Sequence, residues 1–306
     1  MSPLTPLANY KTPCWLAGNT DNGDVTERTT RLRCLPYAML IGVSKCGTTD
    51  LFHRLAKHPQ IFPSKRKEVR FWNRQRIGVL AINALSAQDM SFTQYLRFFD
   101  DAARGIYEYT EVINGEMVHP GIVIEATPHY LWDYGGWETI PGNADLSEPR
   151  FILPDTLRIL EPDLKFLVIL RNPVDRLFSQ FRMLSRGHPS SLFHDLGGIT
   201  LRAGMYSIFL KDWFQRYPKS HFHIIKSEDY YNDLPSSLKE IFKFLKINQI
   251  NKRLRNVITK ERVRNSNKSN SSEPMFPETR QLLNTFYKPF NKDLAKLLEN
   301  TNFQWK

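Results

Sequence analysis

The sequence predicts an α/β fold in which a central parallel sheet is flanked by helices. Three apolar runs support this class, at 37–43, 121–126 and 166–170; the first and third are continuous, and the second is apolar except for Glu125. Strands that are buried on both faces read as uninterrupted apolar runs, as they do in parallel sheets. The first run is bounded by Pro36 and by a polar, glycine-containing loop, and a helical pattern follows it. With 306 residues available, we expect one large α/β domain.

The composition is that of a globular chain with a basic surface. Apolar residues make up 41% of the chain, and six Trp and twenty Phe exclude a disordered protein. The formal net charge of +11 predicts attraction to polyanions, which include nucleic acid, anionic membrane, sulfated sugar and nucleotide phosphates. Three cysteines are too few for a disulfide scaffold or a zinc site, so no metal is implied. Cys14 and Cys34 are candidates for a bridge if the chain lives in an oxidising lumen, and Cys46 is expected to be a small packing residue.

The N-terminal segment differs from the rest of the chain. Residues 1–33 are rich in Pro, Thr, Asn and Gly and lack a sustained period, so we expect an irregular extension before a domain at 34–306. No stretch has the length of a membrane helix, and a basic start followed by an apolar run is missing. We therefore expect either a soluble protein or a chain that has lost its anchor. Sequons at Asn267 and Asn270 are compatible with secretion but also arise by chance in a Ser/Asn-rich segment.

The segment after the first apolar run predicts an anion-binding site. A strand, a short loop with small residues and a lysine, and then a helix N-terminus direct free N–H groups and the helix dipole at one point. Thr48 or Thr49 is expected to cap this helix. The order differs from a Walker A motif, because Lys45 precedes Gly47. Phosphate or sulfate is the expected ligand, and the alternative is a helix start with a surface lysine. The residues concerned are Ser44, Lys45, Cys46, Gly47, Thr48 and Thr49.

A basic run follows a short strand expected at 60–62. Six basic residues and one acid, Glu68, lie within 65–76. A lone carboxylate in such a run is either a surface salt-bridge partner or, because it lies about one strand beyond the anion loop, a base that faces an acceptor hydroxyl. We then expect a helix over 91–103 whose aromatic residues belong to the core.

The second apolar run ends in a polar segment that should border the same cleft, because ligands bind at the carboxyl ends of parallel strands. His129 could act as a base there, although a single histidine is more often packed or on the surface. The candidates next to the site are Glu125, Thr127, His129 and Asp133.

The third apolar run predicts a second phosphate contact. Arg171 stands at its end, and Ser179 lies eight residues later in a helix that Pro173 can begin. Because a strand and the following helix fold back on each other, the guanidinium and the hydroxyl can converge on one phosphate. The alternative is an Arg171 that is capped by Asp175, and an ordinary helix serine.

The C-terminal half predicts the remaining elements. Helices are expected at 202–217, 238–245 and 277–298, and a last parallel strand at 222–225. Residues 256–274 are polar and basic, so we expect a loop that is either mobile or ordered by a ligand. It contains Arg262, Arg264 and Lys268, to which we assign no role.

The order of the motifs is more specific than any one of them. KCGTTDLF, KEVRFW, LRNPVDRLFSQF and MFPETRQLLNTFYKPFNKDLAKLL follow one another along the chain. In this order they resemble the carbohydrate sulfotransferases that use 3′-phosphoadenosine 5′-phosphosulfate (PAPS), from about residue 31 to 305. The resemblance implies a P-loop-like sulfotransferase fold, 34–306 as the sulfotransferase domain, and PAPS as co-substrate.

The resemblance also implies roles for matching residues. The loop from Ser44 to Thr49 would hold the 5′-phosphosulfate, with Lys45 catalytic at the bridging oxygen, where charge develops as sulfate leaves. Arg171 and Ser179 would bind the ribose 3′-phosphate, and Glu68 would be the catalytic base. The candidates for acceptor binding are Lys67, Arg70, Arg74 and Trp132.

The implied acceptor is an anionic glycosaminoglycan, with the 6-hydroxyl of 4-sulfated N-acetylgalactosamine in chondroitin or dermatan sulfate as the specific target, and no nucleic-acid partner. Family members are Golgi proteins with an N-terminal membrane anchor, so the Golgi lumen is implied, with a membrane link only through an anchor that this sequence lacks. Two other classes stay open. A nucleotide-dependent kinase is disfavoured because no Walker A motif or magnesium-binding pair is evident. A non-catalytic binder of sulfated glycan or nucleic acid needs only the basic surface.

Overall fold

The structure of the protein is a computed structural model. It describes residues 5–18, 30–73, 90–184, 198–264 and 274–305. The central strands are β3 (Ala38–Gly42), β4 (Ile61–Pro63), β7 (Ile122–Ala126), β8 (Lys165–Leu170) and β9 (Phe222–Lys226). Across the described residues they form a five-stranded sheet in the order β4-β7-β3-β8-β9, and every neighbouring pair is parallel. The predicted α/β class is confirmed, and so are the predicted strands.

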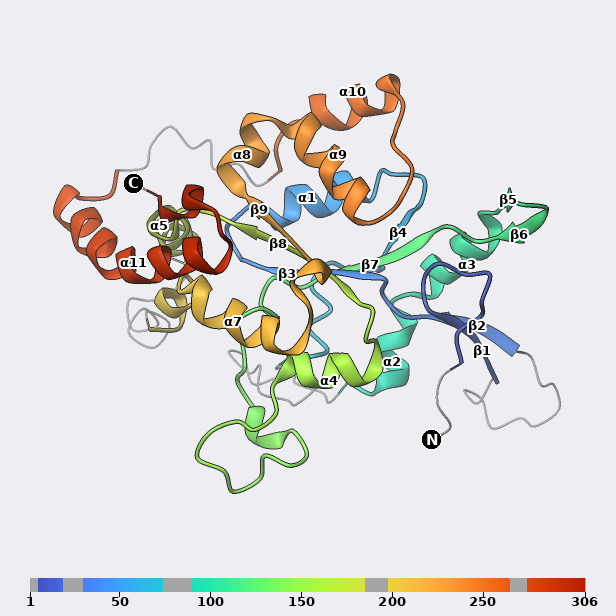
Figure 1. The fold of residues 1–306 in the computed structure, drawn as a ribbon, viewed down its shortest axis with the longest axis horizontal. Helices are drawn as coiled ribbons and strands as arrows, with labels where there is room; N and C mark the ends of the chain where they lie inside the picture. The colour runs from blue at the N-terminus through green and yellow to red at the C-terminus, as the bar shows by residue number, and fades with distance from the viewer. Residues whose placement is uncertain (1–4, 19–29, 74–89, 185–197, 265–273, 306) are drawn as a thin grey trace.

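Helices cover both faces of this sheet. They are α1 (Thr48–Leu55), α2 (Phe92–Arg97), α3 (Asp100–Glu108), α4 (Leu153–Leu160), α5 (Pro173–Leu184), α7 (Tyr206–Arg216), α8 (Ser227–Asn232), α9 (Leu234–Phe244), α10 (Lys252–Lys260) and α11 (Pro277–Leu297). Short 3₁₀ turns lie at Trp137–Thr139, Lys219–His221 and Thr301–Gln304. Figure 1 shows α1, α8, α9 and α10 on one side of the sheet and α4 and α7 on the other, while α11 contacts both α5 and α7.

The core lies between the sheet and these helical layers. All residues of β3 and of β7 are buried, which explains why β3 reads as a continuous apolar run and β7 is apolar except for Glu125. Aromatic rings extend the core toward α2, where Tyr95 stacks on Phe71 with ring centroids 4.5 Å apart. The predicted core role of the aromatic residues in this region is therefore confirmed for Tyr95, which is fully buried.

The helix expected over 91–103 is two helices, α2 and α3. A capping box starts α2, in which Ser91 accepts from the Gln94 amide and the Gln94 side chain accepts from the Ser91 amide. The break follows because the Phe98 carbonyl accepts a hydrogen bond from the Lys65 amide at 2.8 Å, a tertiary contact that sequence periodicity does not report.

Two other predicted boundaries are wrong. The helix expected from Arg202 begins at Tyr206 instead. The loop expected at 256–274 contains the last residues of α10, whose N-terminus is capped by the Asn251 side chain accepting from the Leu254 amide. The sequons at Asn267 and Asn270 lie outside the described residues, as does Lys268.

The N-terminal segment carries a hairpin where an irregular chain was expected. Strand β1 (Cys14–Gly18) pairs antiparallel with β2 (Thr30–Cys34), and Cys14 lies opposite Cys34, to which it is disulfide-bonded. Arg33 of β2 pairs with Asp100 of α3 at 2.6 Å, which holds the hairpin on the domain. A second small hairpin is formed by β5 (Glu111–Ile113) and β6 (Glu116–Val118). In the described part of the chain, no helix has the length and apolarity needed to span a membrane.

Candidate active site

A cavity of about 1110 Å³ lies at the carboxyl ends of the central strands. Each strand continues into a segment that lines it. These segments contribute 44–50 after β3, Glu68 and Arg70 after β4, Pro128 and His129 after β7, Arg171 after β8, and Ser227, Glu228 and Tyr231 after β9. Side chains of α5 and residues 261–264 add to the wall. Open α/β sheets bind ligands at this edge, so the cavity is the candidate active site.

The loop between β3 and α1 directs a helix N-terminus at the cavity. The predicted cap by Thr48 or Thr49 is wrong, because Gly47 is the N-cap, with φ 105°, and no side chain caps the helix. Thr48 and Thr49 are the first two helical residues, and both line the cavity. Without a side-chain cap, the first N–H groups and the helix dipole remain directed at whatever anion occupies the cavity.

Lys45 and Arg171 lie side by side at this cavity. The Arg171 Nη1 atom is 3.5 Å from the carbonyl oxygen of Lys45, although 126 positions separate them in the chain. Tyr206 donates to the Arg171 carbonyl at 2.9 Å, which fixes the end of β8. Ser179 of α5 lines the same cavity, and Asp175 pairs with Arg280 at 2.9 Å. The two predicted phosphate-binding turns therefore face one hollow.

Cys46 packs beneath the loop. Its side chain is buried, and burial raises the pKa of the thiol to about 11, so the sulfur stays protonated at neutral pH. The Ser227 hydroxyl donates to the Cys46 carbonyl at 2.8 Å and ties the loop to the start of α8. Cys46 thus contributes backbone position and packing, and its sulfur is not an activated nucleophile.

Glu68 faces the cavity between two cations. Lys67 Nζ and Arg70 Nη2 each lie 2.7 Å from one of its carboxylate oxygens. Burial alone would favour the neutral carboxyl, but the Lys67 charge and the hydrogen bonds from Arg70 and Lys67 outweigh it and lower the pKa of Glu68 to about 2. In this arrangement Glu68 is ionised at neutral pH and is a weak base.

The backbone that carries Glu68 is strained. Glu68 and Arg70 have φ values of 63° and 62°, a left-handed conformation that costs a non-glycine residue about 1–2 kcal/mol. Such strain persists only where the surroundings enforce it. Here three amides are held: Glu68 N donates to Ala126 O (2.8 Å), Arg70 N to Thr127 Oγ1 (3.3 Å) and Trp72 N to the Tyr130 hydroxyl (3.3 Å).

The other predicted acceptor residues lie in different positions. Arg70 lines the cavity, whereas Lys67 is mostly buried beside Glu68, with 14% of its side chain exposed. Trp132 is half-buried and packs on His129 with ring centroids 5.5 Å apart, next to the cavity wall. Arg74 lies outside the described residues.

Of the polar residues predicted after β7, His129 reaches the cavity, with its Nε2 atom 3.4 Å from Ser44 Oγ. Glu125, Thr127 and Asp133 are buried and are not among the residues that line the cavity, so they contribute from behind its wall. The reason is that the turn after β7 folds back on β3, where the Leu131 amide donates to a β3 carbonyl at 3.0 Å.

Sequence analysis missed a buried ion pair under the anion loop. Asp50 accepts from Arg54 Nε at 2.7 Å, from the Tyr230 hydroxyl at 2.8 Å and from the Arg264 amide at 2.9 Å. Arg54 also donates to the Glu261 carbonyl at 3.0 Å, so the pair ties α1 to the segment that covers one side of the cavity. An acid and an arginine four residues apart in a predicted helix are the signal that could have found it.

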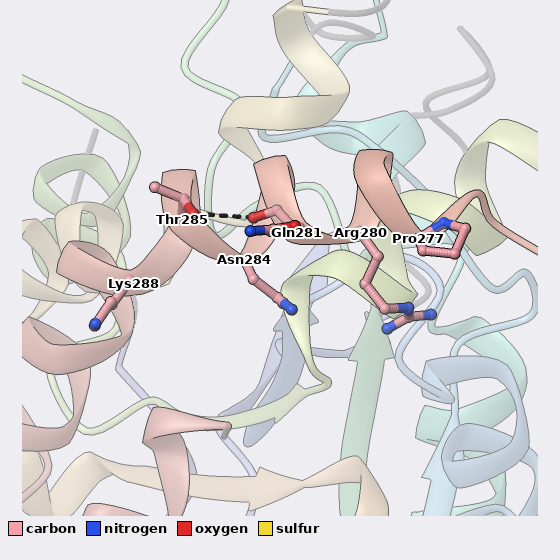
Figure 2. A pocket seen from close by; sticks show the side chains of 6 residues that line it. All are labelled: Pro277, Arg280, Gln281, Asn284, Thr285 and Lys288. Carbon is pink, nitrogen blue, oxygen red and sulfur yellow. Dashed lines mark hydrogen bonds between the residues drawn. The ribbon is translucent and has the colours of Figure 1, made fainter.

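A second hollow, of about 450 Å³, lies against α11. Figure 2 shows its lining side chains on a single helix: Pro277, Arg280, Gln281, Asn284, Thr285 and Lys288. It contains none of the predicted site residues, and we assign no chemistry to it. Among the described residues, no group of three or more His, Cys, Asp or Glu side chains is placed to hold a metal ion.

Comparisons with known proteins agree with this geometry. The family described as "Sulfotransferase domain" matches residues 35–288. Carbohydrate sulfotransferase 15 of Rattus norvegicus is 30% identical over 90% of this chain and 55% of its own length, so this chain spans about half the length of that relative. Heparan sulfate glucosamine 3-O-sulfotransferase 6 of Mus musculus is 26% identical over 89% of this chain and 74% of its own. A solved sulfotransferase from Alicyclobacillus acidocaldarius shares the fold, with a TM-score of 0.59 and 21% identity over 87% of this chain and 96% of that one.

Proposed function

The chain belongs to the sulfotransferase family of enzymes, and from this premise we propose that it transfers the sulfuryl group of PAPS to a hydroxyl of a glycosaminoglycan. One observation carries the proposal. The loop that contains Lys45 and the strand end at Arg171 meet in one cavity, where Arg171 Nη1 lies 3.5 Å from the Lys45 carbonyl oxygen. A donor with phosphate groups on both the 3′ and the 5′ position of its ribose needs two such anion sites within one hollow.

The proposed donor site divides into two parts. The segment from Ser44 to Thr49 would hold the 5′-phosphosulfate through its uncapped helix N-terminus. Arg171 and Ser179 would hold the 3′-phosphate, a task for which the forked guanidinium is suited. Cationic side chains from several segments line the cavity of about 1110 Å³, and their charge supports the binding of an anionic nucleotide.

The proposed reaction needs a base for the acceptor hydroxyl and a cation for the leaving phosphate. The acceptor oxygen forms a bond to sulfur while the bond from sulfur to the bridging phosphate oxygen breaks. Glu68 would take the acceptor proton, and the Lys45 ammonium would neutralise the charge that develops on the leaving phosphate. Both side chains line the same cavity.

For the acceptor we propose the 6-hydroxyl of 4-sulfated N-acetylgalactosamine in chondroitin or dermatan sulfate. The resemblance of the sequence motifs supports this choice, and the net charge of +11 favours a polyanion. Arg70 at the cavity wall, with Lys67, Arg74 and Trp132, are the proposed acceptor contacts.

We also propose that the enzyme works in the Golgi lumen, with 34–306 as its sulfotransferase domain. The disulfide between Cys14 and Cys34 supports an oxidising compartment, since cytosolic thiols are kept reduced.

The test is transfer of radioactive sulfate from PAPS to a panel of desulfated and sulfated glycosaminoglycans. We expect label on chondroitin 4-sulfate, and we expect Glu68→Gln to reduce transfer to a small residual rate while 3′,5′-ADP still binds in calorimetry. Glu116→Gln, the same change on the exposed β6 hairpin, is the matched control and should transfer normally.

Each other outcome excludes a part of the proposal. Normal turnover by Glu68→Gln would remove the base assignment, and a loss in His129→Asn instead would move that role to His129, which also lines the cavity. Glycan binding without nucleotide binding would indicate a non-catalytic binder. Preference for ATP as donor would indicate a kinase.

A further inference from the structure

A buried carboxylate lies directly behind the candidate base. Glu125 on β7 is fully buried and accepts three hydrogen bonds, from the Tyr95 hydroxyl (2.7 Å), the Tyr130 hydroxyl (2.7 Å) and Thr127 Oγ1 (3.0 Å). None of the ion pairs found in the described residues involves it. Burying an unpaired acid is unfavourable, and burial raises the pKa of Glu125 although all three hydrogen bonds oppose the rise. Such a group calls for an explanation beyond packing.

Two of its three donors also touch the segment that carries Glu68. Thr127 Oγ1 accepts from the Arg70 amide, and the Tyr130 hydroxyl accepts from the Trp72 amide, each at 3.3 Å. A hydroxyl has one proton. When Thr127 and Tyr130 give that proton to Glu125, their lone pairs are left pointing at the two amides.

These two amides belong to a segment whose backbone conformation is unfavourable by itself. Glu68 and Arg70 both adopt positive φ, which L-residues avoid, and from this turn the side chain of Glu68 reaches the cavity. The Glu68 amide adds a third contact, to the carbonyl of Ala126, the residue that follows Glu125 in β7. The segment after β4 is thus fixed on the end of β7 at every second residue.

We propose that Glu125 is a positioning residue for the reaction. It orients the Thr127 and Tyr130 hydroxyls, these hold the left-handed turn at Glu68 and Arg70, and the turn aims the Glu68 carboxylate at the acceptor hydroxyl. The inference rests on the proposed function in one respect, which is that Glu68 is the base. It adds a set of buried residues that never touch either substrate.

The experiment removes each hydroxyl without changing shape. Thr127→Val deletes the acceptor for the Arg70 amide, and Tyr130→Phe deletes the acceptor for the Trp72 amide. Each variant should lower kcat about 10- to 100-fold, the scale of a displacement near 1 Å, while the Kd for 3′,5′-ADP changes less than twofold. Tyr217→Phe is the matched control, because Tyr217 is an equally buried tyrosine whose hydroxyl donates to the remote Glu161 carbonyl. It should shift the urea midpoint similarly and leave kcat unchanged.

A double-mutant cycle separates positioning from general destabilisation. In a Glu68→Gln background the effect of Thr127→Val on residual turnover should vanish, because the group being aimed is gone. An undiminished effect in that background would overturn the inference, and so would a kcat for Thr127→Val and Tyr130→Phe equal to that of Tyr217→Phe. If Glu68→Gln itself turns over normally, the base assignment has failed and the inference fails with it, a result distinguishable from the other two. Glu125→Gln is a further variant, and Thr127→Val keeps the test decisive if Glu125→Gln does not fold.

Discussion

Gly47→Ala tests the anion loop at a residue whose backbone conformation disfavours any side chain. Gly47 has φ 105°, and a Cβ atom there would lie 2.5 Å from the Tyr231 hydroxyl oxygen and 3.2 and 3.3 Å from two ring carbons. Real Cβ atoms do not tolerate the first distance, so either the tyrosine or the loop must move. Tyr231 is 42% exposed and can turn outward, whereas the backbone conformation itself has no such escape.

The free-energy cost of Gly47→Ala has two parts. Holding alanine in this region of φ costs about 1–3 kcal/mol. Moving the Tyr231 ring off its preferred rotamer adds about 0.5–1.5 kcal/mol. We expect the variant to relieve the backbone strain by rotating residue 47 out of the left-handed conformation, which turns the following amides away from the cavity. Binding an anion must then return these amides to their original orientation and so reintroduces the strain. A strain of about 2 kcal/mol corresponds to a Kd that is roughly 30-fold weaker.

Calorimetry with 3′,5′-ADP and urea denaturation measure the two parts separately. Gly47→Ala in a Tyr231→Phe background should recover the part of the ring contribution that comes from the hydroxyl oxygen and keep the backbone contribution. Gly115→Ala is the matched control, because Gly115 has φ 83° with nothing within 4 Å of its Cβ position. Gly115→Ala should lower the free energy of unfolding and leave the Kd for 3′,5′-ADP unchanged. Wild-type affinity in Gly47→Ala would refute the reasoning that the loop backbone binds the anion.

Three further predictions concern stability. Arg54→Ala leaves the Asp50 carboxylate buried and unpaired, so urea denaturation should show a loss of about 3–5 kcal/mol, and a loss below about 1 kcal/mol would contradict the role of the pair. The pKa of Glu68 falls from 4.5 to about 2 on folding, so its charge stabilises the fold above pH 4.5 and this contribution disappears as the pH drops through 2. Because 28% of the side chain is exposed, we expect about 1–2 kcal/mol, seen as a difference in acid unfolding between wild type and Glu68→Gln. Replacing Cys14 and Cys34 by serine should cost about 3 kcal/mol for a separation of 20 residues, and reductant should reproduce that loss in wild type only.

The sheet could be predicted because strands that are buried on both faces are rich in apolar residues. Strands β3, β7 and β8 are apolar apart from Glu125 in β7 and Lys165 at the start of β8, and each was found within a residue or two of its predicted bounds. The hairpin of β1 and β2 could not be found in this way. Strand β1 alternates in exposure over only five residues, β2 is exposed at its start and buried at its end, and a disulfide between Cys14 and Cys34 replaces much of the apolar signal.

The site could be predicted from the sequence where a basic residue directly follows a predicted strand. Lys45 and Arg171 follow β3 and β8, neighbouring parallel strands, so their convergence follows from topology. Contacts made by side chains from distant segments left no such signal. The contacts of Tyr231 with Gly47 and of Tyr130 with the Trp72 amide depend on how separate turns pack, which one sequence does not reveal.

The pairing of Glu68 explains how a carboxylate can sit in an anion-binding cavity. Six cationic side chains and five carboxylates line the cavity. Asp50 is neutralised by Arg54 and Asp175 by Arg280, so these two add little repulsion. Glu68 is held by Lys67 and Arg70 in the same way, at the cost of basicity. Under the proposed function, an anionic donor in the cavity raises the pKa of Glu68 through its charge and competes for the Arg70 guanidinium. The base would therefore strengthen only once the group to be transferred is in place.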